Sequence, residues 1–186
     1  MNEKHLSRFN NYFVGFVTLI IWSLLIWQYF NDGVPSHHLF RSPDFPAMSN
    51  WWGGLLLPLL SWGLLARIKS RLVNSYPESV ALLSKQAAVS FVISLVYGTI
   101  LSLTFLYGYS DISAVLFPGI LFFALFFRVY REEFILGFIL SMSFVFGAIL
   151  PMMFGAVIAT GSAIVYFVVH FIWSRLKNFT AKKKIV

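Results

Sequence analysis

Apolar residues along this chain form long blocks that short polar stretches separate. Each block is close to the roughly 20 residues that an α-helix needs to cross about 30 Å of hydrocarbon. Backbone polar groups inside a bilayer must be satisfied within their own segment, so such blocks are expected to be helical. The blocks cover residues 11–30, 46–66, 87–108, 112–128, 134–151 and 154–174. The pattern predicts an all-α integral membrane protein whose six transmembrane helices form a single domain over residues 1–186.

The local sequence at the block ends predicts where some helices begin. Asp44 is a good N-cap and Pro46 suits a first helical turn, so the second helix is expected to start at about Phe45 or Pro46. The pair Ser75 and Glu78 has capping-box spacing around a proline. The third helix is therefore expected to run from near residue 76 to residue 107.

Two further turns follow from the same signals. Ser110 or Asp111 is expected to cap the fourth helix. Pro151 and Gly155 are expected to bracket a very short last external turn.

The distribution of charge predicts the orientation of the bundle. With the N-terminus placed in the cytoplasm, every lysine and arginine except Arg41 falls on the cytoplasmic side. Such a bias predicts that both termini are cytoplasmic and that one long external loop joins the first two helices. In a bacterium the location would be the inner membrane. The expected partners of the basic segments are lipid headgroups rather than nucleic acid, although the net charge is +7.

The residues that are absent exclude several kinds of chemistry. The chain contains no cysteine, which excludes disulfides, thiolate metal sites and a cysteine nucleophile. No acidic or basic residue falls near the middle of a predicted span, which weighs against ion-coupled transport and an intramembrane acid–base enzyme. No cofactor and no metal site are expected. The "EEF" at 132–134 resembles the paired glutamates of intramembrane CAAX-type proteases, but the arginine that should follow is missing. The pair also lies at the cytoplasmic edge, so we do not interpret it as a catalytic site.

The external stretch "HHLFRSPDFPAMSNWWGG" at 37–54 concentrates reactive side chains. Two adjacent histidines can contribute to a metal site, and a histidine with an aspartate can act as an acid–base pair. Arg41 is the only basic residue outside and can bind a phosphate or a carboxylate. The alternative is structural: a capped helix entry that places a tryptophan pair at the headgroup level.

Uncharged polar residues recur at helical spacing within the blocks. One set lies on the third helix, at Gln86, Ser90, Ser94, Tyr97 and Thr104, and another on the sixth, at Ser162, Tyr166 and His170. Such stripes either pack helices together or line a pocket for a neutral or amphipathic molecule. A pocket of that kind would lie under the external loop. The predicted ligand-binding residues are His37, His38, Arg41, Asp44, Tyr97, Thr104, Asp111 and Tyr166.

In its general plan the chain is similar to the substrate-binding subunits of energy-coupling-factor vitamin transporters. The shared features are the size, six helices, inward termini and a long first external loop. In that family the loop closes over a vitamin near the outer surface. The small-xxx-small pattern of their first helix is not found here, because Gly15 is followed four residues later by Leu19. The resemblance concerns the plan alone, and a shared plan does not assign a function.

Three functions are compatible with these features. The first is a multi-pass membrane protein that binds or translocates a small neutral or amphipathic solute at an outward-facing site, as the membrane subunit of a transporter. The second is a membrane-surface enzyme acting on lipid through the 37–44 segment. The third is an accessory subunit of a larger membrane complex, for which other membrane subunits would be the partners.

Overall fold

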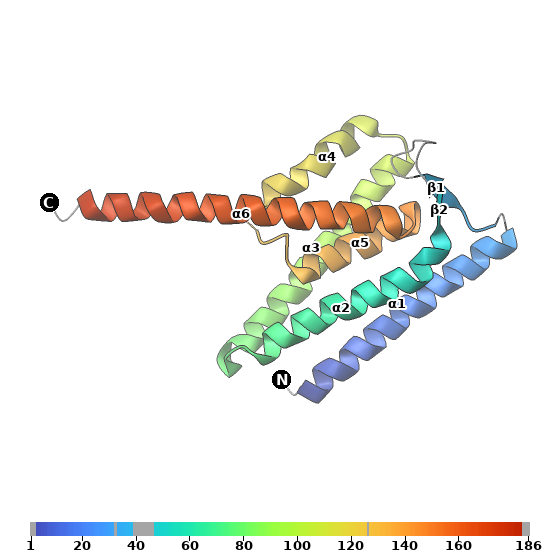
Figure 1. The fold of residues 1–186 in the computed structure, drawn as a ribbon, viewed down its shortest axis with the longest axis horizontal. Helices are drawn as coiled ribbons and strands as arrows, with labels where there is room; N and C mark the ends of the chain where they lie inside the picture. Colours follow the sequence, from blue (N-terminus) through green and yellow to red (C-terminus); the bar gives the residue numbers. More distant parts are fainter. Residues whose placement is uncertain (1–2, 32, 39–46, 126, 184–186) are drawn as a thin grey trace.

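The computed structural model describes residues 3–31, 33–38, 47–125 and 127–183, and these residues are predominantly helical (Figure 1). Two three-residue strands form an antiparallel ribbon in which Ser36 pairs with Ser49 and His38 with Ala47. The elements are α1 (Glu3–Asn31), β1 (Ser36–His38), β2 (Ala47–Ser49), the 3-10 turn η2 (Asn50–Trp52), α2 (Gly53–Val73), α3 (Pro77–Leu106), α4 (Ser110–Phe123), α5 (Glu132–Phe146) and α6 (Ile149–Lys183).

The bundle has two chemically different ends. The start of α1, the α2–α3 turn and the start of α5 form what we call the charged end; the β-ribbon and the α5–α6 turn lie at the opposite, ribbon end (Figure 1). At the charged end Lys69 pairs with Glu3 at 2.9 Å, and the Asn10 amide donates to the Leu65 carbonyl at 3.0 Å. Among the described residues, Asp111 is the only charged one at the ribbon end.

The central helix is α5, which packs against α2, α3 and α6. Its residues 133–139 are all buried, as are Met142 and Ser143. A helix that is apolar on every side is expected in the middle of a bundle. Because α5 exposes so little surface, its short length is compatible with a core position.

Glycine and serine let α3 and α5 approach closely. A Cβ added to Gly137 would lie 2.2 Å from the Ser94 hydroxyl and 2.5 Å from the Phe91 carbonyl oxygen. A Cβ added to Gly98 would lie 2.1 Å from the Ser141 hydroxyl. Each helix therefore contributes a small residue pair four positions apart, the device that brings membrane helices into contact.

The long helix α6 crosses the bundle and projects beyond it towards the C-terminus, with α4 beside it (Figure 1). Phe117 of α4 and Phe154 of α6 hold the two helices together, with ring centroids 4.9 Å apart. The projecting part exposes large apolar side chains, among them Phe167, Phe171 and Trp173. Such exposure is expected of a helix surrounded by lipid.

Four helices are long and apolar enough to cross a membrane: α1, α2 together with its preceding turn, α3, and α6 as far as Arg175. This supports an integral membrane protein. The helix α4 is apolar but shorter, and α5 has only 15 residues, about 22 Å of rise. The count of six spans and the cytoplasmic location of the termini stay predictions.

The predicted entry into the second helix is wrong. Residues 47–49 are extended, because they pair with residues 36–38 of the ribbon. The Ser49 hydroxyl accepts from the Trp51 amide at 3.4 Å, and α2 proper begins at Gly53. The helix still has 21 residues, because it continues to Val73, beyond the predicted end at residue 66. Residues 44–46, on which the predicted cap rested, lie outside the described residues.

The third helix runs from Pro77 to Leu106, close to the predicted bounds, but its predicted cap is wrong. The Ser75 hydroxyl donates to the Arg71 carbonyl at 2.7 Å and so completes the end of α2. Tyr76 in the cap position makes no side-chain hydrogen bond to the start of α3, and Pro77 in the first turn needs no partner for a backbone N–H.

The bounds of the last three helices differ from those predicted. The fourth ends at Phe123 rather than residue 128, and Tyr109 in the cap position makes no side-chain hydrogen bond to its start. The side chain of Ser110, one of the two predicted caps, is outside the described part of the structure, and Asp111 lies in the first turn. Beyond it Ala124 and Val129 are buried, so the connector packs against the bundle instead of continuing the helix. The fifth begins at Glu132, where two glutamates suit the positive end of the helix dipole.

The predicted last turn at Pro151 and Gly155 is also wrong. The turn is made by Gly147 and Ala148, and Pro151 falls in the first turn of α6. There its missing N–H removes no hydrogen bond, because the helix's own bonds begin only after the first turn.

Candidate functional site

A half-open groove of about 490 Å³ runs between α1 and α3, with α5 as its floor. Its apolar walls include Phe13, Ile20 and Leu24 of α1 and Phe91 and Leu95 of α3. At its rim Phe16, Leu103 and Phe144 are 62%, 42% and 59% exposed, so the groove opens towards the surroundings of the bundle. A volume of this size is typical of small-molecule sites.

The polar groups of the groove are hydroxyls, and none of the described residues that line it is charged. Three of them bond to a carbonyl of their own helix: Thr99 to Leu95, Ser141 to Phe138 and Ser143 to Ile139, at 2.7, 2.9 and 2.6 Å.

The fourth hydroxyl, that of Ser102, is buried and has no hydrogen-bond partner among the described residues. An unpartnered buried hydroxyl costs about 1–3 kcal/mol, a cost that a bound polar atom would remove. Ser102 is therefore the point in the groove at which a ligand oxygen or N–H is expected.

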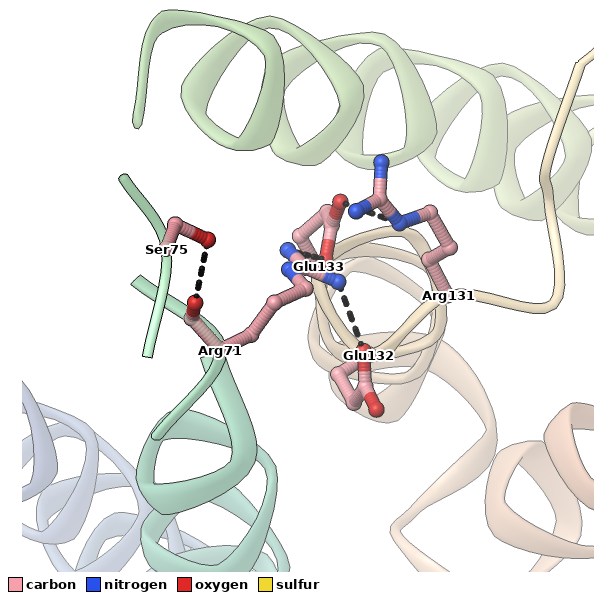
Figure 2. Close-up of polar contacts among 5 residues, drawn as sticks. All are labelled: Arg71, Ser75, Arg131, Glu132 and Glu133. Atoms are coloured by element: carbon pink, nitrogen blue, oxygen red, sulfur yellow. Dashed lines mark hydrogen bonds and ion pairs between the residues drawn. The ribbon is translucent and has the colours of Figure 1, made fainter. Parts of the chain in front are cut away.

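A second polar cluster joins α2 to α5 at the charged end (Figure 2). The guanidinium group of Arg71 donates to Glu132 at 3.0 Å and to Glu133 at 2.9 Å. The Nε of Arg131 lies 3.5 Å from the other oxygen of Glu133, whose side chain is only 2% exposed. Two guanidinium groups thus neutralise two carboxylates.

This arrangement favours a structural role for the glutamate pair. Oε2 of Glu133 accepts from Arg71, and Oε1 lies 3.5 Å from Arg131 without a hydrogen bond among the described residues. Both oxygens are buried, so neither is presented to a substrate. Within the part of the chain that the structure describes, no three histidine, aspartate or glutamate side chains come together as a metal site.

Of the predicted ligand-binding residues, Arg41 and Asp44 lie outside the described residues. His37 and His38 are on β1, and the structure describes their backbone but not their side chains. Asp111 is exposed in the first turn of α4. Whether these residues bind a ligand stays a prediction.

The three remaining predicted residues make separate contacts. The Tyr97 hydroxyl donates to the Leu116 carbonyl of α4, and the Thr104 hydroxyl donates to Leu101 of its own helix at 2.9 Å. Tyr166 accepts a hydrogen bond from Arg128. None of the three lines the groove.

Sequence reasoning missed both Ser102 and the pairing of Arg71 with the two glutamates. A signal for the first was present, because Ser90, Ser94, Gly98 and Ser102 follow one another at steps of four on one helix face. No local signal existed for the second, since its partners are about 60 residues apart. The chain matches no protein-family model, and neither a curated protein nor a solved structure shows detectable similarity to it.

Proposed function

We propose that this chain is a multi-pass integral membrane protein that binds an uncharged or amphipathic small molecule by its hydrocarbon part. The binding site is the groove between α1 and α3. The observation that carries the proposal is the unpartnered, buried hydroxyl of Ser102 in a groove that has no charged lining. The partners are the bilayer and this ligand.

The chemistry of the groove limits the class of ligand. Its aromatic and aliphatic walls favour a hydrocarbon chain or a fused-ring skeleton. A charged group placed there would have no counter-ion, which makes binding of an ion costly. The Ser102 hydroxyl can donate to an ester, ether or ketone oxygen, or accept from a hydroxyl. A lipid-like molecule with one polar function near its chain fits these conditions.

The proposal includes the predicted topology of six spans with cytoplasmic termini. In a bacterium the protein would be located in the inner membrane. Helix ends support it, because α1, α2, α3 and α5 each place their charged residues at the same end of the bundle. That end is then the cytoplasmic one under the positive-inside rule.

The proposal is tested by photolabelling the full chain in vesicles. The probe is a phosphatidylcholine that carries a diazirine in one acyl chain, and labelled peptides are identified by mass spectrometry. Leu95 lies at the groove and is 37% exposed, so Leu95→Trp fills the groove at little cost in folding. We expect labelling of the α1 and α5 groove segments to fall several-fold in this variant.

The matched control is Ile93→Trp, on the same helix, 55% exposed and outside the groove. It should leave labelling of those segments unchanged. Equal labelling in both variants would mean that the groove is ordinary lipid-facing surface and would end the proposal.

The hydroxyl is tested with a second pair of variants. Ser102→Ala should weaken binding of the probe about fivefold, the effect of one neutral hydrogen bond. Thr99→Val should not, because the Thr99 hydroxyl is already bonded to Leu95.

A further inference from the structure

Arg128 lies in the α4–α5 connector and contacts α6 through a tyrosine. Its Nε donates to the Tyr166 hydroxyl at 2.8 Å, and the guanidinium carbon lies 5.4 Å from the centre of the same ring. The His170 ring stacks on Tyr166 with centroids 3.8 Å apart, and the Tyr130 ring lies 5.4 Å away. The aromatic cluster thus fixes the direction of an otherwise flexible side chain.

The charge of Arg128 is not neutralised by the residues that the structure describes. No described carboxylate pairs with it, whereas Arg131, three residues on, pairs with Glu133. Only Nε of Arg128 is used by Tyr166, which leaves both terminal amino groups for another acceptor. The side chain is exposed, so an acceptor from outside the chain can reach it.

The surroundings indicate what that acceptor is. The connector leads into the start of α5, which is part of the charged end. Exposed aromatic rings neighbour Arg128 and Tyr166 along the chain, with Phe127 and Phe167 each 62% exposed. Exposed aromatic rings beside a basic side chain are typical of the boundary between hydrocarbon and headgroups. Arginine binds phosphate through two parallel N–H···O bonds, for which its free edge is suited.

We infer that Arg128 binds the phosphate group of a lipid headgroup, with Tyr166 and His170 as positioning residues that orient the guanidinium group. This site is independent of the groove between α1 and α3, since the two share no residue. Its ligand is recognised by charge, whereas the groove excludes charge.

The test uses the detergent-solubilised full chain and three probes that differ in one part each. Dioleoyl phosphatidic acid and dioleoylglycerol differ only in the phosphate, and glycerol 3-phosphate is the soluble headgroup alone. Binding is counted by native mass spectrometry. We expect phosphatidic acid to bind at least about tenfold more tightly than dioleoylglycerol, as one charge-assisted contact provides.

Binding of glycerol 3-phosphate shows whether the phosphate bound by Arg128 belongs to a lipid or to a free phosphate ester. Weak or no binding of glycerol 3-phosphate supports a lipid ligand. Binding as tight as that of phosphatidic acid would overturn the lipid headgroup and assign the site to a free phosphate ester.

Two variants distinguish a defined phosphate site at Arg128 from a general attraction of the anionic lipid to basic residues. Arg128→Gln should lose about tenfold in affinity for phosphatidic acid. The control Arg175→Gln removes the same charge from α6, where the guanidinium lies 5.1 Å from the Phe171 ring without a hydroxyl contact. It should change affinity less than twofold. An equal fall in both variants, or no fall in Arg128→Gln, overturns the proposal.

The positioning role has its own readout. Tyr166→Phe removes the hydroxyl but keeps the ring, and it should lower the ratio of phosphatidic acid to dioleoylglycerol binding while the circular dichroism spectrum stays unchanged. Arg128→Lys keeps the charge but not the paired donors, so its affinity should fall between those of Arg128→Gln and the unchanged chain. Wild-type selectivity in Tyr166→Phe would overturn the positioning role.

Discussion

The Nη2 atom of Arg71 lies 2.9 Å from Oε2 of Glu133, which joins the end of α2 to the start of α5 (Figure 2). The carboxylate is almost fully buried, while the arginine is 25% exposed. Arg71 stands at the negative end of one helix dipole and Glu133 at the positive end of another, so both dipoles favour the pair. The contact fixes the level of the central helix within the bundle.

Breaking this pair should destabilise the protein strongly. Glu133→Gln leaves Arg131 without its carboxylate partner and Arg71 with only Glu132. We expect a loss of about 2–4 kcal/mol in the free energy of unfolding, because two largely buried guanidinium groups, 25% and 17% exposed, are left with one carboxylate between them. The measurement is denaturant unfolding in detergent. The control Glu3→Gln removes the partner of Lys69, and Glu3 is 63% exposed, so the cost should stay below about 1 kcal/mol. Equal effects would show that the cluster is no stronger than a surface pair.

The close approach of α3 and α5 predicts that Gly137 does not tolerate a methyl group. In Gly137→Ala the new Cβ would lie 2.5 Å from the Phe91 carbonyl oxygen, which cannot rotate away, so the helices must separate. We expect a cost of about 1–3 kcal/mol, measured by the same unfolding experiment. Gly63 is also helical but has nothing within 4 Å of its added Cβ. Gly63→Ala should be neutral or stabilising by up to about 1 kcal/mol. A neutral Gly137→Ala would argue against the observed helix spacing.

The α5–α6 turn predicts a glycine requirement of a different kind. Gly147 has φ 71° and ψ −178°, a conformation that is essentially restricted to glycine. A Cβ there would also lie 2.0 Å from the amide oxygen of Asn50. Gly147→Ala should therefore cost about 3 kcal/mol. Gly108 has φ 77° but open space around it, so Gly108→Ala should show backbone strain alone, about 1 kcal/mol. If thermal unfolding ranks the two variants in the opposite order, the contact with Asn50 is not the determining one.

Labelling of single cysteines distinguishes six spans from four, and the chain is suited to it because it has no cysteine of its own. The positions are Tyr76→Cys in the α2–α3 turn, Tyr107→Cys in the α3–α4 turn and Phe127→Cys in the connector, all well exposed. Six spans predict that a membrane-impermeant maleimide reaches positions 76 and 127 from one side and 107 from the other. If α4 and α5 do not cross, position 127 is labelled together with 107.

The long apolar segments of this protein could be predicted from the sequence because each depends on local composition. A run of apolar residues long enough to cross a bilayer must be helical there, whatever its neighbours are. The predicted bounds of the third helix, residues 76 and 107, are close to the observed Pro77 and Leu106, although the capping box from which its start was inferred does not form. The position of the basic residues of α1, α2 and α3 at one end of the bundle could also be predicted from the sequence.

Contacts between distant residues decided the rest. Residues 47–49 are extended because they pair with residues 36–38, and nothing local distinguishes them from a helix entry. The last turn lies at Gly147, where the close approach of Asn50 leaves no room for a side chain. Ser102 could be recognised as an unpartnered group only once α1 and α5 had been placed around it. Local sequence sets the conformation that a segment prefers, but helix ends, buried ion pairs and cavities depend on which surfaces meet, and only the tertiary structure determines that.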